Sequence, residues 1–574
     1  MEDDVDPSEA DALLAGRQGT LAPLSAPRSL QQEADAECCK WADEWLATER
    51  CPAPPLPPWP LALGQPLPAP CLAVLTAALA SFPAATGLGW DNMHPRALLR
   101  LPTSALRAML RLLILAELLG AWPRCIGLVI IVLLPKADGG RRPIGLQPLL
   151  NRVWGRVRLA IAQTWQREHE RPYFFAGAGK GSTVAAWKQA ARAELAATVR
   201  AADYGIGLLD LAKAFERVPW DWLVTQAAKF GYNLYLLRLS LAAYALERTI
   251  NIQGVCSGTV RALRGITAGS SLATVELRVL MIEWLDQASR FHLVTLTVYV
   301  DDIGVEAVGH RDEMIKQISA ALLGLLRAFA AMRMQFSDTK NMLLASSLGV
   351  AASIAATVPA LPLHTARTAK SLGAGLGAGV RRSATAARKR LLAFAARRSR
   401  FRMLRRAGVN TTRLLKTGGI AALGHAQAVM GVSNRLLLQQ RRAAAAVIDS
   451  LGAGADLDLT FAVADGLRGA AADPAVAAHV EPIVAWATAA WEQWLPRRAL
   501  LTLAADARKR LVAAAVVWSA VRGPGAAFVA TATRLGWVIH DALTATTDAG
   551  EAVMFSRDPP RRIRELVFQS VQRW

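Results

Sequence analysis

The chain has 574 residues, 53% hydrophobic and 19% charged, and such a composition predicts packed domains rather than a disordered polymer. The net charge of +21 indicates a polyanionic partner, nucleic acid before a membrane surface. The N-terminus is acidic, which argues against a secretory signal. The longest apolar run, residues 126–134, is too short to span a membrane. Six cysteines without regular spacing indicate neither a zinc site nor a disulfide framework. We therefore expect a soluble intracellular protein of the nucleus or cytoplasm, not a secreted one.

The charges are unevenly distributed along the chain. Residues 1–50 carry twelve acids and four bases, whereas residues 339–448 carry nineteen Lys and Arg and no Asp or Glu. A charge run is usually a solvated face, but an acid-free run of this length predicts contact with nucleic-acid phosphates. A nuclear-targeting cluster is an alternative role for the same residues.

Secondary structure is predicted to begin near Leu72. Residues 1–50 indicate a flexible acidic arm, and the nine prolines of residues 51–71 predict an extended linker. Residues 102–120 then show the apolar periodicity of a helix.

A hairpin follows. The β-branched run 126–134 predicts a buried strand, and the turn Asp138-Gly139-Gly140 returns the chain toward Pro143. Lys136 and Arg142 lie at its tip, where two cations suit a triphosphate, although the hairpin by itself favours a solvated turn.

The next segments are a helix over 151–168 and a glycine-rich loop over 174–183 that contains Lys180. The loop lacks the spacing of a P-loop, so an ordinary ATPase is rejected. Residues 204–210 then predict a buried strand that ends on Asp210, followed by helix-forming residues 211–216.

The glycine loop 264–271 is predicted to open a helix that runs to about residue 290, with free amides for phosphate or base contact. In residues 296–305 two β-branched runs flank Asp301 and Asp302, which predicts a hairpin with both acids at its tip. A polar turn explains the pair, but a divalent cation would offset the cost of burying it. A helix over 311–332 and a strand that starts near Lys340 follow.

The order and spacing of these segments resemble the reverse transcriptase domain of non-LTR (LINE-like) retrotransposons. The matching segments are the fingers motif (Lys136 with Arg142 to Ile144), the glycine-rich segment 177–183, motif A (209–215), motif B (265–271), motif C (299–302), the lysine of motif D (Lys340) and the primer grip (369–373). The resemblance covers roughly residues 86–435. It implies an α+β right-hand polymerase fold, with a palm built on an antiparallel sheet and a helical thumb.

The resemblance also implies domain limits. After an acidic arm and linker (1–71) it places an N-terminal extension with the fingers at 72–200 and the palm at 201–345. The primer grip and basic thumb then span 346–448. Residues 449–574 are alanine-rich and predicted to be helical, with the tryptophans as core anchors, and their role is open. No endonuclease pattern is evident, so a fragment of a longer polyprotein is expected.

In this family the three acids Asp210, Asp301 and Asp302 hold two Mg²⁺ ions (Mn²⁺ being possible) about 3.5–4 Å apart for nucleotidyl transfer. Lys136 and Arg142 would bind the triphosphate, and Lys340 would protonate the leaving pyrophosphate. The resemblance adds three residues to the nucleotide site, Leu211, Phe215 and Gly269. The Phe215 ring would collide with a ribose 2′-hydroxyl and so favour deoxynucleotides; the alternative is a core residue.

The implied partners are an RNA template, a DNA or RNA primer and dNTPs. The residues implied to contact nucleic acid are Lys180, Lys370, Arg388, Lys389, Arg390, Arg397, Arg398, Arg405 and Arg406. Glu216 replaces the Asp that the family usually has, and Thr267 and Ala268 replace its Pro-Gln pair. Ala268 leaves a second hypothesis open: a degenerate or repurposed, maturase-like RNA-binding protein.

Overall fold

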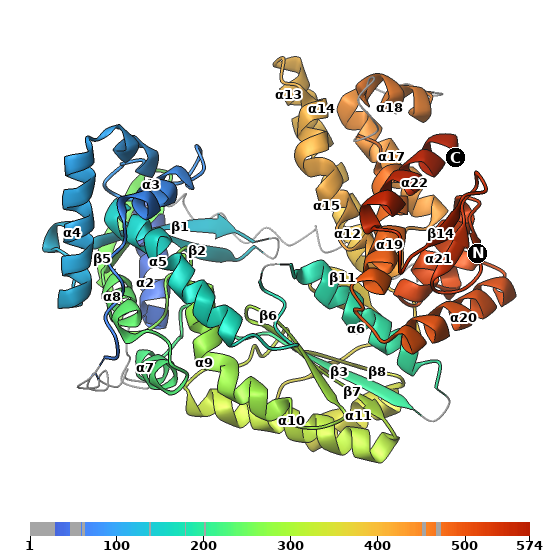
Figure 1. Cartoon of the computed structure of the whole chain (residues 1–574), viewed down its shortest axis with the longest axis horizontal. Helices are drawn as coiled ribbons and strands as arrows, with labels where there is room; N and C mark the ends of the chain where they lie inside the picture. The colour runs from blue at the N-terminus through green and yellow to red at the C-terminus, as the bar shows by residue number, and fades with distance from the viewer. Residues whose placement is uncertain are drawn as a thin grey trace.

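The structure is a computed structural model that describes residues 29–45, 59, 63–136, 139–177, 179–199, 202–449, 455–465 and 472–574. Figure 1 shows a four-stranded sheet with its helices at the left, a second sheet at the bottom, and helices at the right. These parts have the arrangement of fingers, palm and thumb, and the C-terminal region lies beside the thumb.

The palm is a five-stranded sheet in the order β6-β7-β3-β8-β9. Its strands are β3 (Asp203–Leu209), β6 (Val294–Tyr299), β7 (Asp302–Gly309), β8 (Met342–Ala345) and β9 (His364–Thr365). All neighbours are antiparallel except β8 and β9. The predicted strand before Asp210 and the predicted Asp301–Asp302 hairpin are confirmed.

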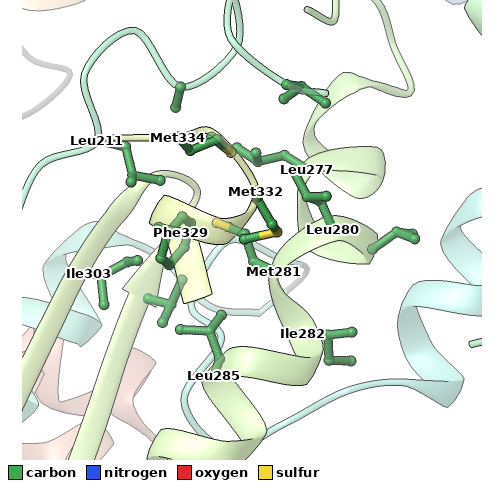
Figure 2. Close-up of a cluster of buried hydrophobic side chains, with 14 of the residues drawn as sticks. Leu211, Leu277, Leu280, Met281, Ile282, Leu285, Ile303, Phe329, Met332 and Met334 are labelled. Carbon is green, nitrogen blue, oxygen red and sulfur yellow. The ribbon is translucent and has the colours of Figure 1, made fainter. Parts of the chain in front are cut away.

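Helices α9 (Ala273–Ala288), α10 (Arg311–Ala331) and α11 (Leu348–Thr357) pack on this sheet, and α6 (Ser182–Ala196) also contacts β3 and β6. Figure 2 shows the core that they enclose, where Met281 of α9, Phe329 of α10 and Ile303 of β7 meet. Within the described residues, α10 is the one helix long and apolar enough to cross a membrane by length and composition. Its apolar side chains are buried against the palm, as in the core helix of a globular domain.

The fingers sheet has the order β2-β1-β4-β5. Its strands are β1 (Leu128–Pro135), β2 (Arg141–Leu146), β4 (Glu247–Ile252) and β5 (Val255–Arg261). The β1–β2 hairpin is as predicted, although Ala137 and Asp138 of its turn lie outside the described residues. Since β4 and β5 come from the range assigned to the palm, a boundary at residue 200 does not separate the two sheets.

Six helices accompany the fingers sheet and its junction with the palm. They are α3 (Leu72–Ala80), α4 (Thr103–Leu119), α5 (Leu149–Glu168), α6 (Ser182–Ala196), α7 (Trp220–Lys229) and α8 (Leu234–Tyr244), with 3-10 turns at Pro95–Arg100 and Arg124–Ile126. Helices α4 and α5 confirm two sequence predictions within two residues at each end.

The prediction of a flexible acidic arm is wrong for residues 30–45, which form helix α2 (Leu30–Trp45). Trp41 and Trp45 are 3% and 1% exposed and pack against Val129 and Ile250 of the fingers sheet. Two large aromatic side chains four residues apart give α2 an apolar stripe, and its burial stabilises the helix in spite of its acidic composition.

The thumb follows a short hairpin of β10 (Ala369–Ser371) and β11 (Ala374–Leu376). Its elements are α12 (Thr385–Ala395), α13 (Arg398–Arg406), α14 (Thr411–Leu414), a π-helical turn at Leu415–Gly419, α15 (Ile420–Gly424), α16 (Gln427–Met430) and α17 (Asn434–Ile448). The basic residues 385–406 thus lie on two consecutive helices, α12 and α13.

The C-terminal region contains helices and one small sheet. They are α18 (Leu457–Asp465), α19 (Pro474–Trp491), α20 (Arg497–Ala513), α21 (Pro524–Arg534) and α22 (Pro560–Arg573), a 3-10 turn at Val517–Ala520, and strands β12 (Val538–Ile539), β13 (Thr544–Thr546) and β14 (Ala552–Met554). The prediction of a helical region missed this sheet. Trp486 and Trp537 are core residues, but Trp491 and Trp574 are 43% and 52% exposed and are not.

This region is packed onto the polymerase part rather than separate from it. The buried Glu194 of α6 accepts hydrogen bonds from the amides of Gly525 and Ala526, at the start of α21, and is paired with Arg510. A carboxylate at a helix N-terminus satisfies otherwise unpaired amides and is stabilised by the helix dipole.

Candidate active site

The two adjacent acids lie at the turn between β6 and β7. Tyr299 pairs with Asp302, which leaves Val300 and Asp301 as the connecting residues. Val300 has a φ of 61°, a left-handed conformation that costs a β-branched residue of order 1–3 kcal/mol. The structure thus holds the turn strained at the point where the acids lie.

Asp210 follows β3, which is antiparallel to β7, so that Leu209 lies opposite Ile303 and Asp210 is adjacent to the turn. The backbone of Asp210 is fixed on both sides. Its amide donates to Asn341 Oδ1 at 2.9 Å, and its carbonyl accepts from the Ser337 amide at 2.7 Å. The buried Asn341 amide thereby orients the first acid.

The three acids interact electrostatically. The pKa of Asp302 is raised to about 6, first by burial and then by repulsion from Asp301 and Asp210. The Asp302 side chain has solvent access, but it lies in a concave site where surrounding protein displaces much of the water. Burial and Asp210 likewise raise the pKa of Asp301, against the positive charges of Arg142 and Lys340.

A cavity of about 630 Å³ lies over these strands. Asp210, Asp302 and Lys340 line it from the palm, Lys370 from the β10–β11 hairpin, and Arg390 from α12. The cavity therefore brings residues of motif A, motif C, the primer grip and the thumb into one space.

Lys340 lines the cavity next to the acids. Its Nζ is 3.2 Å from Asp210 Oδ2, and its side chain is 53% exposed. Within the part of the chain that the structure describes, no three His, Cys, Asp or Glu side chains are grouped so as to hold a metal ion. The acids supply the hard oxygen ligands that Mg²⁺ prefers, but Lys340 neutralises one of them here.

The fingers hairpin supplies two of the predicted cations. Lys136 and Arg142 are both exposed, and the charge of Arg142 acts on Asp301. The neighbouring Arg141 is instead bound by Glu33 and Glu37 of α2. Strand alternation thus places Arg142 toward the acids and Arg141 toward α2.

The predicted helix at residues 211–216 is absent, and this segment is a series of turns. Leu211 forms a bridge with Phe336, and the Ala212 amide donates to the Gln335 carbonyl, so tertiary pairing prevails over helix propensity. The Leu211 side chain is buried in the core of Figure 2, which leaves its backbone for any nucleotide contact. Phe215 is half-buried at the edge of that core.

The glycine loop of motif B packs on both neighbouring segments. A Cβ on Gly265 (φ 88°) would lie 2.4 Å from the Glu216 carbonyl oxygen. A Cβ on Gly269 (φ 118°) would lie 2.6 Å from the Gly145 oxygen of β2. These close approaches require glycine and lock the loop to motif A and to the fingers.

The residues predicted to contact nucleic acid divide into two groups. The exposed group comprises Lys370 at the cavity, Lys389 on α12, Arg397 between the two helices, and Arg398 and Arg406 on α13. The second group has protein partners: Lys180 with Glu170, Arg390 with the carbonyls of Gly373 and His425, and further intramolecular interactions for Arg388 and Arg405.

Four residues of the site were missed from the sequence. Asn341 orients Asp210, Gln189 accepts a 2.9 Å hydrogen bond from the Ser371 hydroxyl of the primer grip, and His425 lines the cavity. Glu44 of α2 binds Lys213 and Arg217. Asn341 is adjacent to the predicted Lys340, and Glu44 lies between two tryptophans that mark a buried helix face, but Gln189 and His425 stand out by no such pattern.

Together the elements form a right-hand polymerase fold, with acids in the palm between fingers and thumb. Residues 134–374, less than half of the chain, match the family model described as reverse transcriptase (RNA-dependent DNA polymerase). The chain thus contains a reverse transcriptase domain, whose general activity is RNA-templated DNA synthesis.

Among solved structures, the chain is similar to apo telomerase from Candida tropicalis truncated from the C-terminal domain. The two share 13% identity and a TM-score of 0.32 over 45% of this chain and 54% of the telomerase chain. The match thus spans about half the length of that telomerase. A comparison with curated proteins gives no match.

Proposed function

We propose that the chain is an RNA-directed DNA polymerase that adds dNTPs to a primer 3′-hydroxyl by two-metal nucleotidyl transfer. One observation carries this proposal: Asp210 and Asp302 line the same cavity as Lys340, Lys370 and Arg390, beside Asp301. Carboxylates that can hold metal ions, with cationic side chains around the same space, are the groups that such a reaction needs.

The donor set fits divalent metal. Asp210, Asp301 and Asp302 are oxygen ligands whose mutual repulsion a cation would relieve. Bound Mg²⁺ would lower the pKa of the primer hydroxyl and neutralise the triphosphate. The Lys340 ammonium must leave Asp210 for all three acids to serve.

The remaining residues bind and orient the substrates. Arg142 and Lys136 would hold the triphosphate from the fingers side, and Phe215 would exclude a 2′-hydroxyl beneath the sugar. Lys340, once released from Asp210, would lie near the leaving pyrophosphate and donate a proton to it. The exposed arginines of α13 would follow the duplex backbone without sequence preference.

We also propose that the domain acts within a non-LTR retrotransposon, inside the cell, in the nucleus or cytoplasm. The order of the seven sequence motifs supports the retrotransposon origin. The five cysteines within the described residues are free thiols, which suits a reducing compartment.

Primer extension on an RNA template with dNTPs and Mg²⁺ tests the activity. We expect synthesis by the wild type, loss of at least about a hundredfold in Asp301→Ala, and no loss in the matched control Asp312→Ala, an exposed acid on α10. Equal rates for the wild type and Asp301→Ala would refute the polymerase. RNA binding without synthesis would instead support the maturase-like alternative that Ala268 leaves open.

A further inference from the structure

The last turn of α2 contacts the segment that carries Phe215. The Glu44 carboxylate is paired with Lys213 Nζ, and it accepts hydrogen bonds from Arg217 Nε at 2.7 Å and Nη2 at 3.4 Å. Lys213 and Arg217 lie two residues before and two residues after Phe215. One carboxylate thus joins both ends of the turn.

Glu44 lies on a rigid support. The Trp45 ring is buried with the Arg248 guanidinium 4.8 Å from its centre, and the Trp45 carbonyl accepts from the Leu263 amide at 2.7 Å. Arg264 Nε donates to the Glu44 carbonyl at 2.8 Å. Because Leu263 and Arg264 precede the motif B loop, the end of α2 is fixed to motifs A and B together.

The turn itself needs such support. Lys213 has a φ of 51°, a conformation that is unfavourable for a residue other than glycine. Two amides, those of Glu216 and Arg217, donate to the Lys213 carbonyl at 3.1 Å, and the Phe215 carbonyl accepts from Ile266 at 2.8 Å.

Glu44 stays ionised in this place. Burial acts to raise the pKa of Glu44, but the hydrogen bonds from Arg217 and Lys213 outweigh it and hold the pKa below its usual value. The carboxylate is therefore a fixed negative charge between two cations at neutral pH.

We propose that Glu44 is a positioning residue for sugar selection. It holds the Lys213–Arg217 turn so that the Phe215 ring stays where a ribose 2′-hydroxyl would collide with it. The acidic N-terminal helix then contributes to the discrimination between deoxy- and ribonucleotides. This inference rests on the proposed function, since sugar selection by Phe215 is part of it.

The test compares full-length wild type with Glu44→Gln, with Arg217→Gln, and with Asp43→Asn. Asp43→Asn is the matched control, because Asp43 is exposed and its carboxylate makes no hydrogen bond or ion pair with a described residue. Two quantities are measured: the ratio of dNTP to rNTP incorporation efficiency, and amide hydrogen exchange at Glu216 and Arg217.

We expect Glu44→Gln and Arg217→Gln to lower the discrimination ratio about tenfold, the effect of losing one hydrogen bond to a charged group. Exchange at Glu216 and Arg217 should accelerate by about the same factor, while exchange in β6 and β7 stays unchanged and shows that the palm is folded. Asp43→Asn should match the wild type in both measurements.

Unchanged exchange at the turn in Glu44→Gln overturns the inference, whether or not the chain extends a primer. If Phe215→Ala lowers the discrimination ratio and Glu44→Gln does not, the positioning role is wrong and sugar selection by Phe215 stands. If Phe215→Ala leaves the discrimination ratio unchanged, sugar selection by Phe215 and the positioning role of Glu44 are both wrong.

Discussion

We predict that the stability of the palm depends on pH through Glu276. The side chain lies on α9 with no exposure to solvent, next to Tyr232, and the Tyr244 hydroxyl donates to it. The Tyr244 oxygen in turn accepts a hydrogen bond from the Ser270 hydroxyl in the motif B loop, at 3.1 Å. Burial raises the pKa of Glu276 from 4.5 to about 7, and the Tyr244 hydrogen bond offsets part of the effect.

The direction of the pH dependence follows from the raised pKa of Glu276. Between pH 4.5 and about 7 the folded chain holds a proton on Glu276 that the unfolded chain has released, so stability falls as pH rises through this window. Moving the pKa from 4.5 to about 7 corresponds to roughly 3 kcal/mol. Glu276→Gln, which is uncharged at every pH, should therefore be more stable than the wild type at pH 8, by up to about 3 kcal/mol, and close to it at pH 4.5.

Urea unfolding of both proteins between pH 4.5 and 8 measures this difference. Glu283→Gln on the same helix is the matched control, with the opposite sign. Burial acts to raise the pKa of Glu283, but hydrogen bonds from Lys229 and Gln226 lower it, so this variant should lose stability at pH 8. The reasoning about Glu276 is refuted if Glu276→Gln is no more stable than the wild type at pH 8.

Three further predictions concern the cations of the site. Arg390→Ala should destabilise the thumb by about 1–3 kcal/mol, because it leaves the Gly373 and His425 carbonyls unpaired. The salt dependence of RNA binding should stay unchanged in this variant. An altered salt dependence together with normal thermal stability would contradict the prediction. Lys340→Ala should tighten Mg²⁺ binding up to about fivefold by calorimetry, since it frees Asp210 from an exposed ion pair; equal or weaker affinity would contradict it. Replacing the arginines of α13 by alanine should flatten the fall of RNA affinity with salt; for the wild type, a loss below about tenfold between 50 and 200 mM salt would oppose phosphate contact.

The sequence predicted those parts of the site whose pattern is local. A β-branched run on each side of Asp301 and Asp302 specifies a hairpin, and an apolar strand that ends on Asp210 specifies its neighbour. Both are present because strand alternation and turn chemistry depend on adjacent residues. The predicted helix at 211–216 failed for the converse reason, since its backbone pairs with Gln335 and Phe336.

Contacts between distant residues had no such signal. Lys213 and Glu44 are 169 residues apart, and acidic composition alone made residues 30–45 look like a flexible arm. The tryptophans at positions 41 and 45 were the available clue, because their spacing gives one buried helix face.

The arginines of the acid-free segment 339–448 do not all have the same role. Because residues 339–448 contain no carboxylate, a buried arginine there must be satisfied by backbone carbonyls or by acids from elsewhere. Arg390 donates to the carbonyls of Gly373 and His425, and Arg382 donates to those of Met430, Gly431 and Trp518. These guanidiniums connect the thumb to the primer grip and to the C-terminal region. The arginines of α13 differ, because no residue of that helix is buried. Net charge therefore overstates the number of cations free to contact phosphate, and α13 is one segment of the thumb where charge and exposure coincide.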